Sequence, residues 1–157
     1  MLDARVYCNC IEAGQLRVQP KAHWQVAVLE DGGVEASCAD KGEASELARW
    51  WEMACEHKDR QLLYHCLGNV GLAAFLREEL GRVAEKCPLV LGLVVYDGVH
   101  GGDFLTVEQV RDVAEELHAL AGFRCEKEAD QYSLDCFLEQ MRELVAASLS
   151  VNKPIAF

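Results

Sequence analysis

Hydrophobic and polar positions alternate over residues 4–11, and this period of two predicts a β-strand near the start of the chain. Two more strands are predicted over residues 24–29 and 34–38. The segment between them, residues 31–33 (Asp-Gly-Gly), is typical of a hairpin turn because glycine readily adopts a positive φ. A fourth strand is predicted over residues 62–67, so the N-terminal half of the chain is expected to be rich in strands.

Residues 89–96 form the longest apolar run, and they are apolar almost throughout rather than at alternate positions. Continuous apolarity of this kind is typical of a strand that is covered on both faces. We therefore expect residues 89–96 to form the central strand of the sheet. A glycine-rich loop, residues 97–103, would leave its carboxyl end.

Four other segments carry apolar residues at the spacing of an amphipathic helix. The predicted helices begin near residues that commonly cap a helix N-terminus, namely Ser45, Asn69, Thr106 and Ser133. Gln109 stands three residues after Thr106 and completes a capping-box pattern. Pro88 is expected to end the second helix.

The order of these elements, β-β-β-α-β-α-β-α-α, indicates an α+β fold rather than a doubly wound one. We expect a mixed or mainly antiparallel sheet of about five strands, with about four helices packed on it. The chain has 157 residues and no linker-like tract, so residues 1–157 are expected to form a single domain. The apolar C-terminal residues, 155–157, are expected to dock on the body.

The net charge of the chain indicates which kinds of partner it can attract. Fifteen Lys and Arg residues face 26 Asp and Glu residues, which gives a formal net charge of −11 at pH 7. A field of this sign repels nucleic acid and anionic membranes and attracts basic proteins, although it also serves solubility alone. Residues 106–147 carry ten acids and four bases, so the last two helices are expected to have an acidic outer surface.

The first residues lack the apolar core of a signal peptide, and no apolar run is long enough to span a bilayer. We therefore expect a cytoplasmic protein that binds neither membrane nor nucleic acid. Its eight cysteines are expected to be reduced thiols, most of them acting as small core residues.

Two groups of residues could carry chemistry. In the loop at residues 97–103, His100 could act as a base with Asp97 or Asp103 as its partner. The alternative, which we favour, is that the glycines and aspartates of this loop only form turns.

The second group is rich in thiols. Cys8 and Cys10 share one face of the first strand, while Cys55 and His57 close the first helix. Three thiolates and an imidazole would satisfy tetrahedral zinc. The spacing is not that of a standard zinc motif, and cysteines on a strand face more often fill a core, so we expect no bound metal or other cofactor.

Four stretches of sequence together resemble one group of proteins. They are YCNC at residues 7–10, WWEMACEH at 50–57, HCLGN at 65–69 and YDGVHGGDFL at 96–105. The pattern resembles small bacterial proteins that look like the immunity partners of polymorphic or contact-dependent toxins. The resemblance implies a binding protein without catalytic activity, which neutralises a cognate protein toxin by direct contact.

The acidic composition favours a basic toxin, because an acidic inhibitor can mimic a nucleic-acid substrate. Encounter residues are expected on the last two helices, at Asp112, Glu115, Glu116, Glu139 and Glu143. Two alternatives stay open, a small enzyme that uses the His100 loop and a zinc-stabilised regulatory or scaffold protein. The oligomeric state is also left open.

Overall fold

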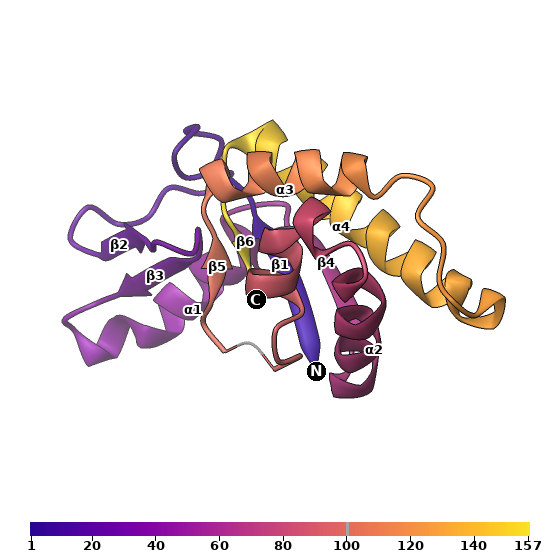
Figure 1. Cartoon of the computed structure of the whole chain (residues 1–157). Coiled ribbons are helices and arrows are strands. Elements are labelled where there is room, and N and C mark those ends of the chain that lie inside the picture. The colour runs from indigo at the N-terminus through magenta and orange to yellow at the C-terminus, as the bar shows by residue number, and fades with distance from the viewer. Residues whose placement is uncertain (100) are drawn as a thin grey trace.

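A computed structural model describes residues 1–99 and 101–157, and it shows an α+β fold built on two antiparallel sheets (Figure 1). The strands are β1 (Leu2–Tyr7), β2 (Gln25–Val28), β3 (Val34–Ser37), β4 (Gln61–Gly68), β5 (Phe104–Leu105) and β6 (Ile155–Ala156). The longer helices are α1 (Ala44–Met53), α2 (Val70–Gly81), α3 (Val107–Ala119) and α4 (Gln131–Val151). The predicted fold class is confirmed.

The larger sheet has the strand order β4-β1-β6-β5, so β1 lies inside it. Leu2, Ala4 and Val6 are buried on one face of β1, and the residues between them are half-buried. Strand β6 pairs with β1 and with β5, so the C-terminal tail docks as expected and fills the gap between them.

The helix boundaries follow local capping chemistry. The Asn69 side chain accepts a hydrogen bond from the backbone N–H of Leu72 at the start of α2. Thr106 and Gln109 form the predicted capping box at the start of α3. Among the described residues, no helix combines the length and apolar character needed to cross a bilayer.

The prediction of a central strand over residues 89–96 is wrong. Residues 90–94 form a short π-helical turn, and Val90, Val94 and Val95 are completely buried. The carboxylate of Glu116 on α3 accepts hydrogen bonds from the backbone N–H groups of Leu89 and Val90, at 2.8 and 2.9 Å. A side chain thus satisfies backbone donors that a strand partner would otherwise take. Three valines of the segment enter the core, while Leu89, Leu91 and Leu93 are half-buried and Tyr96 is exposed.

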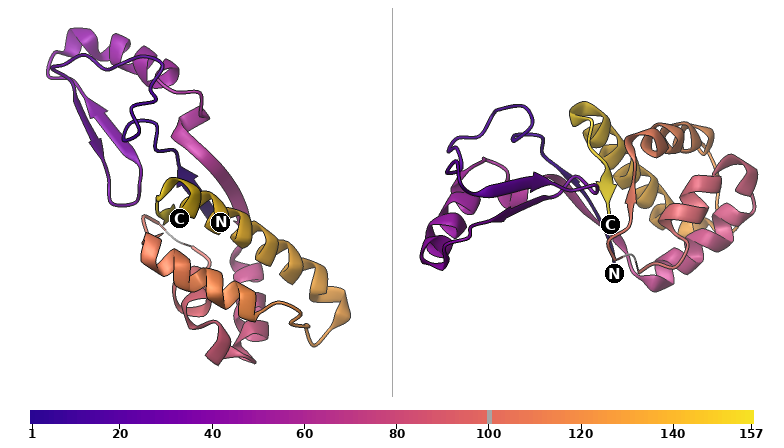
Figure 2. Two further views of the ribbon diagram at one scale, coloured as in Figure 1. Left: turned by 90° about the horizontal axis from the view of Figure 1, so that it is seen from above. Right: turned by 90° about the vertical axis from the view of Figure 1, so that its left-hand side faces the viewer.

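Strands β2 and β3 and helix α1 stand apart from the larger sheet and its helices (Figure 2). We call residues 24–54, which contain these three elements, the hairpin lobe. The lobe has a small core of its own around Trp24, Trp50 and Ala54, separate from the main core. The chain leaves the larger sheet at the end of β1 and returns at the start of β4. The lobe is therefore an insertion between these two paired strands.

Candidate metal centre

Four side chains meet at the base of the hairpin lobe. Cys8 and Cys10 follow β1, and Cys55 and His57 precede β4. Because β1 and β4 are antiparallel neighbours, the segment that leaves one runs beside the segment that enters the other. The backbone N–H of Cys8 donates to the carbonyl oxygen of Arg60 at 2.8 Å and extends this pairing into the site.

The four potential ligand atoms of these residues all lie within 4.8 Å of one another. The Sγ atom of Cys55 is central, at 3.6 Å from Cys8 Sγ and 3.7 Å from Cys10 Sγ. The Nδ1 atom of His57 lies 3.2 Å from Cys55 Sγ and 3.4 Å from Cys10 Sγ. Residues from two segments that are 45 and 47 positions apart are therefore brought into one cluster.

Four of these separations are close to the edges of a zinc tetrahedron. With Zn–S bonds of about 2.3 Å and a Zn–N bond of about 2.0 Å, sulfur atoms would be about 3.8 Å apart and sulfur and nitrogen about 3.5 Å apart. Four of the six separations, 3.6, 3.7, 3.2 and 3.4 Å, differ from these edges by a few tenths of an ångström, and the other two lie within 4.8 Å. Three thiolates and one imidazole would fill all four positions, as in structural rather than catalytic zinc sites.

The surroundings hold the cluster in place. Cys8, Cys10 and Cys55 are buried and pack with Leu16 and Leu62. The backbone N–H of His57 points at Cys55 Sγ, with a separation of 3.2 Å. This contact orients the Cys55 side chain toward His57.

Protons and metal compete for these sulfurs. Burial raises the pKa of the Cys8 thiol. Burial, helped by the neighbouring thiols of Cys8 and Cys55, raises the pKa of Cys10 to about 12. Both groups therefore keep their protons near neutral pH when no metal is bound, and a metal has to displace those protons in order to bind.

Arg60 lies beside the site, and no pattern in the sequence indicated this position. Its guanidinium carbon lies 5.0 Å from the ring centroid of Trp50 and 4.2 Å from that of Trp51, and the residue is buried. Its carbonyl accepts the hydrogen bond from Cys8 described above. Arg60 thus connects the thiol cluster to the aromatic core of the hairpin lobe.

Comparison of this chain with family models, curated proteins and solved structures gives no match. Function is therefore inferred from the side chains themselves. The structure brings together the four residues of the predicted thiol group. The outcomes for the His100 loop and for the acidic encounter residues are different.

His100 lies outside the described residues, so the proposed pairing with Asp97 or Asp103 has no described geometry. The Asp97 carboxylate accepts a hydrogen bond from the backbone N–H of Val99 at 2.9 Å, as in an aspartate turn. The hydroxyl of Tyr96 donates to the Asp103 carboxylate, which raises the pKa of Tyr96 to about 12. The described aspartates are thus engaged in local hydrogen bonds.

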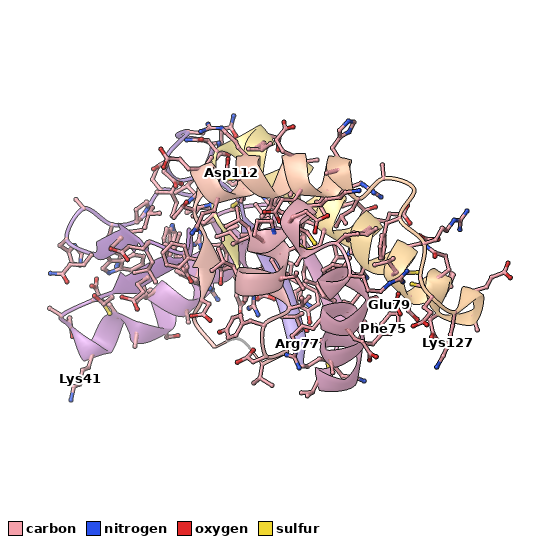
Figure 3. All side chains as sticks on the ribbon, viewed as in Figure 1. Lys41, Phe75, Arg77, Glu79, Asp112 and Lys127 are labelled. Carbon is pink, nitrogen blue, oxygen red and sulfur yellow. The ribbon has the colours of Figure 1, made fainter. Side chains whose placement is uncertain are left out.

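The expected encounter residues divide into two groups. Asp112, Glu115, Glu139 and Glu143 are exposed, and Asp112 is labelled on α3 in Figure 3. Glu143 also lies 2.6 Å from His65 Nε2. Glu116 was expected at the surface but is buried, because its carboxylate holds the backbone at Leu89 and Val90. It cannot meet a partner in this fold.

Proposed function

We propose that this chain is a zinc-binding protein in which the metal closes the base of the hairpin lobe. The observation that carries the proposal is the clustering of Cys8, Cys10, Cys55 and His57 at the spacing of a zinc tetrahedron. All four ligands come from the protein, so the metal would have a structural role. The chain would then act as a regulatory or scaffold protein that presents the lobe to a partner.

The lobe needs such support for a physical reason. Its sheet has two strands of four residues each, and within the lobe only α1 and the small core around Trp24 and Trp50 support it. The metal would join segments that lie 45 to 47 residues apart. It would thereby reduce the conformational entropy that the chain gains when the two segments separate. Zinc binding and ordering of the lobe would therefore be coupled.

The compartment belongs to the same proposal. We place the protein in the cytoplasm, where reducing conditions keep thiols available for zinc. None of the eight cysteines forms a disulfide in the described structure.

The first test is the zinc content of protein purified without chelator. We expect one zinc per chain, and we expect Cys55→Ser to lose it because Cys55 touches the other three ligands. Cys66→Ser is the matched control, since Cys66 is exposed and outside the cluster. Substitution with cobalt should give the thiolate-to-metal charge-transfer absorption of a tetrahedral site in the wild type and in the control. A zinc content that is well below one and equal in all three proteins would refute the proposal.

A second candidate function is immunity-type binding, in which the protein neutralises a basic toxin by direct contact. The supporting observation is that Asp112, Glu115 and Glu139 are exposed on α3 and α4, in a chain of formal net charge −11. A salt-sensitive complex with a basic toxin, formed at one-to-one stoichiometry and abolishing its activity, is the expected result. A toxin that keeps full activity in excess of this protein would remove the candidate. The two functions are compatible, because the acidic helices lie outside the zinc cluster.

A further inference from the structure

Cys55 touches both other thiols of the cluster, and this arrangement suits a second kind of crosslink. We propose that peroxide oxidises the thiols so that a disulfide between Cys55 and either Cys8 or Cys10 replaces the metal. This inference rests on the proposed zinc site. The metal leaves in this exchange, and the base of the hairpin lobe stays closed. The site would therefore respond to oxidants by releasing zinc without releasing the lobe.

The sulfur atoms are already close enough for the exchange. Cys55 Sγ lies 3.6 Å from Cys8 Sγ and 3.7 Å from Cys10 Sγ, and a disulfide bond is about 2.05 Å long. Closing these gaps takes an approach of roughly 1.6 Å, which side-chain rotation and small backbone shifts can supply.

Backbone contacts keep the two segments together when the metal is absent. Cys8 N–H donates to the Arg60 carbonyl at 2.8 Å, and Arg17 N–H donates to the Ala54 carbonyl at 2.7 Å. These bonds flank the thiols on both sides of Cys55. Loss of zinc therefore does not by itself separate the sulfurs that must react.

Cys55 is the expected first target. Its Sγ atom lies within 3.7 Å of both other sulfurs, so an oxidised Cys55 has two thiols in reach. Its thiolate attacks one oxygen of hydrogen peroxide, the O–O bond breaks, and hydroxide leaves. The product is a sulfenic acid on Cys55, with two other cluster thiols within reach.

The second step forms the crosslink. The thiolate of Cys8 or Cys10 attacks the sulfenic sulfur, the S–O bond breaks, and a second hydroxide leaves. Two sulfurs have then lost two electrons in total, and one peroxide has been reduced to two hydroxides. Zinc loses two of its four ligands, and the remaining thiolate and His57 are too few to hold it tightly.

The test starts from zinc-loaded protein that is treated with hydrogen peroxide in the presence of a chromogenic zinc indicator. Free thiols are then alkylated, and the disulfides are mapped by mass spectrometry of peptides. We expect one zinc released for each disulfide formed, with Cys55 linked to Cys8 or to Cys10. Cys8→Ser and Cys10→Ser each lack one zinc ligand, so they test the crosslink alone. The first should form the Cys10–Cys55 bond and the second the Cys8–Cys55 bond, while Cys66→Ser should behave as the wild type.

Hydrogen exchange supplies a second readout. Backbone amides of β2 and β3 should stay protected in the peroxide-treated protein, because a disulfide holds the base of the lobe. The same amides should exchange faster, without full loss of protection, in reduced protein from which a chelator has removed zinc, because only the flanking backbone hydrogen bonds then hold the base.

The outcomes separate this inference from the proposed function. If the protein holds zinc but peroxide produces sulfinic acids, or disulfides to Cys66 or Cys136, the exchange is refuted and the zinc site stands. Loss of protection in β2 and β3 after oxidation would also refute it. If the protein never holds zinc, the proposed function fails, and the exchange fails with it.

Discussion

The Nζ atom of Lys153, just after α4, donates a hydrogen bond to the carbonyl oxygen of Gly32 at the tip of the β2–β3 hairpin, at 3.1 Å. The two residues are 121 positions apart, and Lys153 is buried. The same amine forms an ion pair with Glu12. The turn of the β2–β3 hairpin, which faces the body of the protein, is therefore held by the C-terminal segment through a contact separate from the thiol cluster.

Replacing Lys153 by methionine should loosen this tip contact. Methionine keeps most of the apolar stem but leaves the Gly32 carbonyl and Glu12 without their buried donor. We expect the free energy of unfolding to fall by about 1–3 kcal/mol, and hydrogen exchange in β2 and β3 to become faster. Chemical denaturation and amide exchange measure the two effects.

Lys41→Met is the control for this experiment. Lys41 lies in the short 3-10 turn before α1, is exposed, and extends away from the body in Figure 3. A surface substitution of this kind should change stability by less than about 0.5 kcal/mol. Equal effects of the two substitutions would show that Lys153 has no special part in holding the lobe.

Zinc binding should release protons, and its affinity should depend on pH. Burial raises the pKa of Cys8 and Cys10, so both thiols are protonated in the metal-free protein at pH 7. Zinc binds thiolates, so at least these two protons must leave for each zinc bound. Affinity should therefore rise with pH and weaken as the pH falls.

Calorimetry in two buffers with different ionisation enthalpies gives the number of protons directly. Two or more protons released per zinc at pH 7 is the expected result. Release of none would mean that the metal binds elsewhere, for example on surface carboxylates. Cys10→Ser should reduce the count by about one, because serine stays protonated.

The buried carboxylate of Glu116 gives a third prediction. Glutamine at this position keeps one carbonyl oxygen, but its amide group cannot accept the second of the two backbone hydrogen bonds from Leu89 and Val90. Glu116→Gln should therefore lower the free energy of unfolding by about 1–3 kcal/mol. Thermal or urea denaturation measures it, and Glu115→Gln on the exposed side of the same helix should be nearly neutral. A neutral Glu116→Gln would indicate that water or a small shift replaces the lost acceptor.

The contact between Glu116 and the backbone of Leu89 and Val90 also explains why the prediction of a strand over residues 89–96 is wrong. Helix starts at Asn69 and Thr106 could be predicted because their capping groups lie within three residues in the sequence. The conformation of residues 89–96 instead depends on Glu116, 26 positions beyond Val90. Continuous apolarity reports burial, and it does not distinguish a covered strand from a covered helical turn.

The thiol cluster could be predicted from the sequence only in part, for a similar reason. The sequence identifies Cys8, Cys10, Cys55 and His57 as capable of binding zinc, but their spacing matches no standard motif. Their convergence depends on the pairing of Tyr7 with Gln61, where β1 ends and β4 begins. Pairing between distant strands is decided by tertiary packing, which a single sequence does not display.

The acidic surface gives the last prediction, which tests the binding role separately from zinc. Reversal of Asp112 and Glu115 on α3, and of Glu139 on α4, to lysine should slow association with a basic partner about tenfold at low salt. It should also flatten the salt dependence of the association rate, since fewer complementary charges remain to be screened. Stopped-flow or surface-binding kinetics at two ionic strengths measure both effects.

Glu30→Lys with Glu35→Lys is the control, since both residues are exposed and lie on the hairpin lobe rather than on α3 or α4. The control changes net charge by +4, close to the +6 of the triple variant. Comparing the two variants therefore shows whether association depends on the location of the altered charges or only on the net charge. If the acidic helices meet the partner, the triple variant slows association far more than this difference in charge explains. If both variants slow it in proportion to their charge, the partner senses only the overall field, and α3 and α4 are not the docking surface.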